Sequence, residues 1–456
     1  MSAAAITQIY RYPFASNFDG PRRQLRLAAQ AESQTSPHYF QGRMQNPRLT
    51  CDLLRGLMRI VQSRFFTPPA MLAKTIALSD PVVTCSDEML RFEGFSACCG
   101  VYARVDLTSE TLDGQWLARG TTNVDFNAPM LSALAMVQTT DEVQLAVGAD
   151  EVRLESGGTQ IVEKKVELPI RWLKGLMEVQ VCQSRMEEMI SVSAIEGRRF
   201  LRGLPRMHTH RRPTWIAPAG NGLRVTQIEN RDAVRVGGLQ RLRILEPLIT
   251  TAGRLQIYRD PATAAAAFVL EFPGCRFHLV LSPEVWRGFS GEGQVLSATA
   301  LSSDDRDTEL ARVRAALRWD TVLDPAVIAA RAATTAQRVT ALLDVLSTQG
   351  VVGFDLSSQA YFHRLLPFDL DSLRSSSAKM QPRLAAATKL IEEDKVRLGK
   401  QYDGKYEVMV ASSDVVHRVR IDEQSAKCSC PWHAKHQNDR GPCKHILAAQ
   451  IFLGIQ

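Results

Sequence analysis

The residues with the clearest chemistry lie near the C-terminus, as two pairs separated by a spacer of twelve residues. Cys428 and Cys430 form the first pair, Cys443 and His445 form the second, and one residue stands between the members of each pair. Three thiolates and one imidazole suit Zn²⁺, which takes four tetrahedral sulfur or nitrogen ligands in structural sites. We therefore expect one structural zinc ion, with no open position for water or substrate.

Short secondary-structure elements are predicted to position these pairs. Apolar residues at strand spacing predict strands over 406–410 and 415–421, and the apolar run 446–452 predicts a helix. A helix that starts beside Cys443 offers free N–H groups and its positive dipole end to the thiolate. His433 and His436 lie in the spacer, and either could replace a cysteine. Because exposed loop histidines are commoner, we leave both out of the ligand set.

The CxC, spacer, CxH arrangement from about residue 402 to 453 resembles the SWIM zinc finger. The resemblance implies that the four residues named above are the zinc ligands. Four upstream stretches resemble bacterial SWIM proteins associated with a MoxR-like AAA ATPase and a von Willebrand factor A-type protein: 80–84, 91–106, 121–127 and 163–169. The resemblance implies a scaffold or adaptor that contacts such proteins or DNA, and it implies no established activity.

Length and composition indicate a folded chain of several domains. The 456 residues are 45% hydrophobic and 23% charged, with a formal net charge of +7. No apolar run approaches the roughly 18 residues that a membrane helix needs, and the N-terminus lacks a secretory pattern. The nine cysteines are odd in number, and those outside the zinc motif show no disulfide framework spacing. We expect a soluble cytoplasmic protein that does not contact the membrane.

Positive charge gathers in the middle of the chain, where eleven arginines and three acidic residues lie between 194 and 243. The densest part mixes guanidinium groups with aromatic rings, a combination that suits phosphates and exposed bases. A charge cluster can equally be a solvated face or a protein-docking surface. Both interpretations stay open for six candidate binding residues: Arg198, Arg199, Arg202, Arg206, Arg211 and Arg212.

The pattern of elements predicts an α+β multidomain protein. An N-terminal arm with an amphipathic helix is expected over 1–80, and a β-rich body over 81–301. A winged-helix-like module is expected over 302–370, because three helical stretches (309–317, 325–332, 335–346) precede a strand pair, and Thr334 with Gln337 resembles a capping box. A hinge and helix over 371–401 then lead to a ββα SWIM zinc finger over 402–456.

These observations favour a non-enzymatic, zinc-dependent adaptor for protein and DNA contacts. The alternative is a direct DNA or RNA binder that uses the finger, the winged helix and the arginine-rich segment. An enzyme is disfavoured, because Ser96 and Cys98 lack the glycine spacing of a nucleophile elbow. We expect those residues to be small buried groups in a strand.

Overall fold

The computed structural model describes a mixed helix and sheet protein that is rich in strands and contains several separate sheets. The described residues are 17–19, 24–26, 38–65, 81–124, 126, 128–149, 151–156, 159–164, 170–205, 213–286, 288–289, 304–366, 382–402, 405–422, 425–437 and 442–454. Within them, no helix combines the length and apolar character needed to cross a membrane. Two short strands, β1 (Asn17–Asp19) and β2 (Gln24–Arg26), pair near the N-terminus.

The body is built on an antiparallel sheet with the order β12-β16-β17-β18-β6-β5-β4-β8. Its two halves have mirrored orders and meet where β6 pairs with β18. One half holds β4 (Val82–Cys85), β5 (Met89–Phe95), β6 (Val101–Thr108) and β8 (Gly120–Asn123). The other half holds β12 (Glu187–Ser193), β16 (Arg254–Arg259), β17 (Ala266–Phe272) and β18 (Cys275–Leu281).

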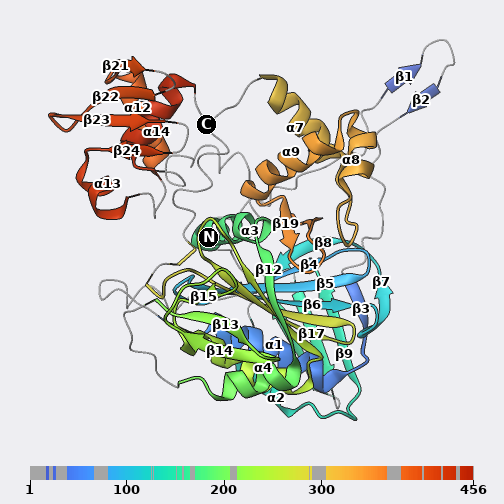
Figure 1. Ribbon diagram of the computed structural model, residues 1–456. Coiled ribbons are helices and arrows are strands. Elements are labelled where there is room, and N and C mark those ends of the chain that lie inside the picture. Colours follow the sequence, from blue (N-terminus) through green and yellow to red (C-terminus); the bar gives the residue numbers. More distant parts are fainter. Residues whose placement is uncertain are drawn as a thin grey trace, which may run out of the picture.

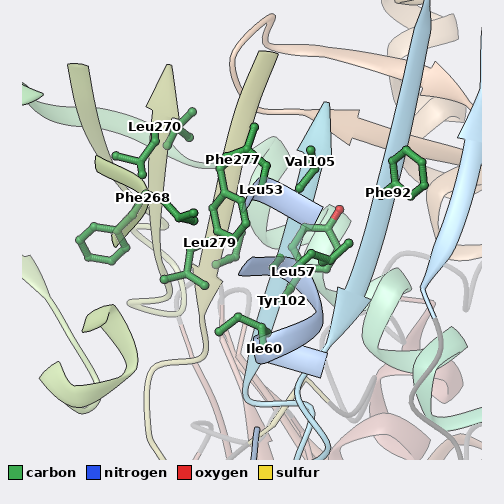
Figure 2. Packing of buried hydrophobic residues seen from close by; sticks show 14 of the residues in the cluster. Leu53, Leu57, Ile60, Phe92, Tyr102, Val105, Phe268, Leu270, Phe277 and Leu279 are labelled. Atoms are coloured by element: carbon green, nitrogen blue, oxygen red, sulfur yellow. The ribbon is translucent and has the colours of Figure 1, made fainter. Parts of the chain in front are cut away.

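Helix α1 (Pro47–Val61) packs on the middle of this sheet, against β5 and β6. Figure 2 shows Leu57 of α1 beside Tyr102, and Leu53 near Phe277. The close approach depends on Gly94 of β5, where an added Cβ would lie 2.5 Å from Val61 Cγ2. The amphipathic helix predicted near residues 53–66 is therefore present. It belongs to the core of the body, whereas the sequence analysis grouped it with the N-terminal arm in 1–80.

Two smaller sheets and several helices complete the body (Figure 1). The five-stranded sheet has the order β11-β10-β9-β3-β7, and the three-stranded sheet has the order β14-β13-β15. Their strands are β3 (His38–Met44), β7 (Leu112–Trp116), β9 (Val143–Gly148), β10 (Glu151–Ser156), β11 (Thr159–Lys164), β13 (Trp215–Ala219), β14 (Gly222–Thr226) and β15 (Val234–Arg235). The helices are α2 (Ala128–Met136), α3 (Ile170–Ser184), α4 (Ala194–Arg202), η2 (Leu239–Ile244), α5 (Leu245–Leu248) and η3 (Ile249–Thr251).

A helical module follows, with three helices and a two-stranded hairpin in the predicted order. The elements are α7 (Asp304–Ala316), α8 (Pro325–Ala332), α9 (Ala336–Thr348), β19 (Val352–Asp355) and β20 (Ala360–His363). The cap of α9 is Thr335, whose hydroxyl accepts from Arg338 N–H at 3.3 Å. The predicted capping residue, Thr334, instead donates to Glu309. The likeness to a winged helix rests on this order of elements alone.

The C-terminal module is larger than the predicted ββα unit, because two further strands, β21 and β24, and two further helices, α12 and α13, belong to it. Its sheet has the order β21-β22-β23-β24, with antiparallel neighbours throughout. The elements are α12 (Pro382–Glu392), β21 (Val396–Tyr402), β22 (Lys405–Ser412), β23 (Val415–Ile421), β24 (Ala426–Cys428), α13 (Pro431–His436) and α14 (Lys444–Leu453). Helices α12 and α14 pack together, and Ala387, Leu390 and Val396 share one hydrophobic cluster with the metal-ligand residues.

Candidate metal centre

The three cysteines and the histidine of the C-terminal motif converge at the junction of β24, α13 and α14. Cys428 is the last residue of β24, and Cys430 caps the N-terminus of α13. Cys443 caps α14, and His445 lies in the first turn of that helix. All four side chains are buried, so the polypeptide shields the cluster from bulk water.

The separations between the four ligand atoms match a tetrahedral zinc site. The three sulfurs and one imidazole nitrogen all lie within 4.8 Å of one another. His445 Nδ1 is 3.8 Å from Cys428 Sγ and 3.9 Å from Cys443 Sγ. Zinc bonds of about 2.3 Å to sulfur and 2.0 Å to nitrogen give tetrahedral edges of roughly 3.5–3.8 Å. The cluster therefore fits one structural zinc ion that the protein surrounds on all four sides.

Backbone N–H groups point at the sulfurs and favour their charged form. Cys428 Sγ accepts from Cys430 N–H at 3.4 Å, and Cys430 Sγ accepts from His433 N–H at 3.3 Å. Cys443 Sγ accepts from Ile446 N–H at 3.5 Å, at the positive end of the α14 dipole. Without metal, the pKa of Cys443 is lowered to about 4, first by a hydrogen bond from the Cys428 thiol, and the pKa of Cys428 is raised.

Neighbouring side chains fix the walls of the site. The His417 ring of β23 lies 4.2 Å from the His445 ring, centroid to centroid. Arg383 of α12 donates to Pro442 O at 3.0 Å, and its guanidinium lies 4.9 Å from the centre of the Trp432 ring. Helix α12 therefore contacts Pro442, the residue before Cys443, and Trp432 of α13, which explains why this helix belongs to the finger.

Of the two spacer histidines, His433 has a described side chain, and it is not one of the four clustered ligands. His433 lies on α13 with 9% of its surface exposed, so it is buried and does not face solvent. Its backbone N–H donates to the sulfur of the ligand Cys430. His436 ends α13, and its side chain lies outside the described part.

A second group of potential ligands, Asp106, His278 and Asp355, lies where the body meets the helical module and is fully buried. The Arg104 guanidinium fills the space among them. Its Nη2 donates to Asp106 Oδ2 at 2.9 Å and to Asp355 Oδ1 at 2.8 Å, and lies 3.2 Å from His278 Nε2. Because a guanidinium already neutralises the carboxylates, this group is an ion-pair network and lacks the character of a metal site.

The network joins the helical module to the body sheet. Asp355 belongs to β19, whereas Arg104 and Asp106 belong to β6. Arg364, directly after β20, donates twice to the Glu93 carboxylate of β5, at 2.8 and 2.9 Å. Burial raises the pKa of Asp355, but the neighbouring cations, Arg104 first and Arg91 after it, together lower that pKa to about 2. The Asp355 carboxylate therefore stays ionised, and the hairpin is held against the sheet by charge.

Among its described residues, the arginine-rich segment does not form one continuous basic face. Arg198, Arg199 and Arg202 lie on α4, where Arg199 pairs with Glu196 at 3.0 Å. Arg241 is fully buried and donates to Gly100 O at 2.8 Å. Two further cations of the segment pair with acidic residues, as Arg235 with Glu284 and Arg243 with Glu246. Three predicted binding residues lie outside the described part: Arg206, Arg211 and Arg212.

The serine and cysteine cluster of residues 96–99 forms the turn between β5 and β6, where a strand was expected. Ser96 Oγ lies 3.4 Å from Cys98 Sγ, and Cys99 adopts a positive φ of 53°. The residues are small and mostly buried, as predicted, and they close a hairpin.

Comparisons with known proteins identify the C-terminal region alone. No curated protein matches the chain. Proliferating cellular nuclear antigen from Entamoeba histolytica has a TM-score of 0.37 at 12% identity, covering 54% of this chain and 99% of that chain. The PCNA of A. fulgidus, bound to the C-terminal region of FEN-1, has a TM-score of 0.35 at 12% identity, covering 54% and 98%. Likeness at this level does not establish a shared fold.

The zinc finger is identified by its sequence pattern as well as by its geometry. The pattern that defines the SWIM zinc finger matches residues 417–451, a range that runs from β23 into α14 and contains all four ligands. The chain therefore carries a C-terminal SWIM zinc finger, whose Cys428, Cys430, Cys443 and His445 fit one structural zinc ion.

Proposed function

We propose that the protein is a zinc-dependent binding adaptor without catalytic activity of its own. One observation carries the proposal: the four ligands are buried and close the tetrahedron, which leaves no coordination position for a substrate. A metal held in this way stabilises the fold of a small module and contributes to any reaction only through that stability.

The partners and location of this adaptor are proposed from the sequence resemblance. The chain is similar to bacterial SWIM proteins that are associated with a MoxR-like AAA ATPase and a von Willebrand factor A-type protein. We propose partners of these two kinds, in the cytoplasm. The body and the helical module, which have separate hydrophobic clusters and are joined by buried ion pairs, would then be the scaffold that carries the finger.

The winged-helix-like module is proposed as a packing unit of this scaffold. Its α9, the position of a groove-reading helix, packs against α3 of the body. Every residue of β19 is buried. Elements that are already packed on protein are poorly placed to enter a DNA groove, which favours a structural role.

A pull-down from the native host tests the adaptor. Wild type, Cys428→Ser and the control Cys98→Ser are compared, because Cys98 is a thiol outside the zinc cluster. We expect the first variant to lose zinc and its partners, and the control to keep both. Partners retained by a zinc-free Cys428→Ser protein would contradict the proposal.

Direct nucleic-acid binding is the second candidate, and one observation favours it. The finger sheet carries exposed cations on the face that alternates away from its buried valines. The sequence analysis left this role open for the arginines of residues 198–212; among the described ones, Arg199 is exposed and pairs with Glu196.

A further inference from the structure

The outward face of the finger sheet gathers cations from all four strands. Strand alternation buries Val408, Val410 and Val419 on one side and directs the residues between them to the other. Cross-strand register brings these outward residues side by side, as Lys400 with Glu407, Glu407 with Arg420, and Arg420 with Lys427. We call this surface the basic face; it comprises Arg397, Lys400, Tyr402, Lys405, Glu407, Met409, Val416, Arg418, Arg420 and Lys427.

Charge on the basic face is strongly unbalanced, since six of these ten residues are cations and one is an anion. Glu407 lies between Arg418 and Arg420, at 3.8 and 3.1 Å, and holds both guanidinium groups in place. The arginine side chains remain 54% and 66% exposed. One carboxylate cannot neutralise six cations, so the surface attracts a polyanion.

A cleft of about 420 Å³ lies toward the β24 side of the basic face, where Cys428 and Ser429 complete its lining. Met409 and Val416 form its apolar part, and Arg418, Arg420 and Lys427 form its charged part. Val416 and Tyr402 are 56% and 60% exposed, so apolar and aromatic surface is available beside the charges. Proteins that bind single-stranded nucleic acid combine two features: cations that track the phosphate backbone, and apolar or aromatic side chains that contact the bases.

The shape of the face favours a single strand over a duplex or a peptide. Four strands spaced about 4.8 Å apart make a surface about 14 Å wide between the outer strands, which exceeds the roughly 12 Å major groove. A peptide would dock by adding a strand to a sheet edge or by filling an apolar groove. The basic face presents side chains rather than backbone hydrogen-bonding groups, and most of these side chains are charged.

We propose that the basic face of the finger binds the phosphate backbone of single-stranded nucleic acid. This inference deepens the nucleic-acid candidate and rests on it. The zinc supports the surface, because Lys427 directly precedes the ligand Cys428, and Ser429 bonds to the Arg418 backbone in both directions, at 2.9 and 3.0 Å. The ion thus fixes β24 beside β23.

The test measures binding of the full-length zinc protein to fluorescent 20-nucleotide oligo(dT) and oligo(rU), a 20-base-pair duplex and polyglutamate, over a series of salt concentrations. The variant is Arg418→Gln/Arg420→Gln/Lys427→Gln. The control, Arg198→Gln/Arg199→Gln/Arg202→Gln, removes equal charge from α4. Zinc content is measured for each protein, and neither variant touches a ligand.

We expect the wild type to bind both single strands more tightly than the duplex and polyglutamate. Each lost phosphate contact lowers the magnitude of the slope of log K against log salt concentration by about 0.7. The finger variant removes three cations, so this slope should fall by about 2, and the affinity near 0.1 M salt should fall about 100-fold. The control should stay near the wild type. A preference between oligo(dT) and oligo(rU) would identify the natural strand, and equal binding would indicate backbone recognition.

Three results would overturn the inference: an unchanged affinity in the finger variant, an equal loss in the control, or tighter binding of duplex or polyglutamate. The adaptor proposal is judged separately. The finger variant keeps its zinc, so host partners that persist in its pull-down while oligonucleotide binding disappears would separate the two activities.

Discussion

Removing the Asp355 carboxylate should release the β19–β20 hairpin from the body. The side chain has no exposed surface, and its oxygens lie 2.8 Å from Arg104, 3.4 Å from Arg276 and 3.9 Å from Arg91. Asp355→Ala leaves the fully buried guanidinium groups of Arg91 and Arg104 short of a counter-charge. Loss of one partner from a buried ion pair costs about 3–5 kcal/mol. Local opening of the hairpin should become easier by that amount.

Hydrogen exchange of the hairpin amides measures this directly. At about 1.4 kcal/mol for each factor of ten, the amides of β19 and β20 should exchange roughly 10² to 10⁴ times faster, while those of the finger keep their rates. The control is Asp324→Ala, which removes an exposed cap of α8 and should cost about 1 kcal/mol. An acceleration below tenfold in Asp355→Ala would refute the reasoning that charge holds the hairpin.

The pH dependence of the same interface has a defined sign. The folded-state pKa of Asp355 is about 2, below its unfolded value of about 3.9. A depressed carboxyl pKa contributes stability that is present above the unfolded value and is lost as the pH falls through the folded value. Hairpin exchange in the wild type should therefore accelerate between about pH 4 and pH 2, and Asp355→Ala should lack this contribution.

Three further predictions concern other parts of the molecule. Cys443→Ser, or removal of the zinc with a chelator, should abolish zinc binding and raise hydrogen exchange over 405–454. The body has a separate core and should keep its protection from exchange; loss of that protection would contradict the prediction. Burial lowers the pKa of His363 to about 4, so stability should fall by about 2 kcal/mol between pH 7.5 and 5, and His363→Phe should abolish that fall in urea titrations. Gly114→Ala places a Cβ 2.4 Å from the facing backbone and should lower the melting temperature, whereas Gly253→Ala, with its nearest contact at 3.8 Å, should not.

The sequence predicted the zinc cluster well because its information is local. Ligand identity, the spacing of each pair and a helix starting at Cys443 are all visible in about thirty residues, and a metal needs little else from the fold. The segment 396–402 was missed as a strand because its residues are almost all exposed. It occupies the edge of the sheet, where neither face has to be apolar.

The interface between helical module and body was hidden for a different reason. Arg91, Arg104 and Arg364 have no exposed surface, whereas arginine is expected at the surface of a protein. Only their carboxylate partners make the burial tolerable, and Glu93 and Arg364 are 271 positions apart in the chain. Pairing over such separations leaves no periodic pattern, so single-sequence reasoning treated the helical stretch as a unit of its own.

The pairing of β6 with β18 dictates an order of events during synthesis. Val101–Thr108 is made early, yet its ladder partner Cys275–Leu281 emerges from the ribosome only much later. Until then the nascent first half presents a strand edge with open hydrogen-bonding groups, a state that favours association with other chains. Productive maturation thus depends on keeping that intermediate apart from its neighbours, and fragments ending before residue 281 should accumulate as aggregates.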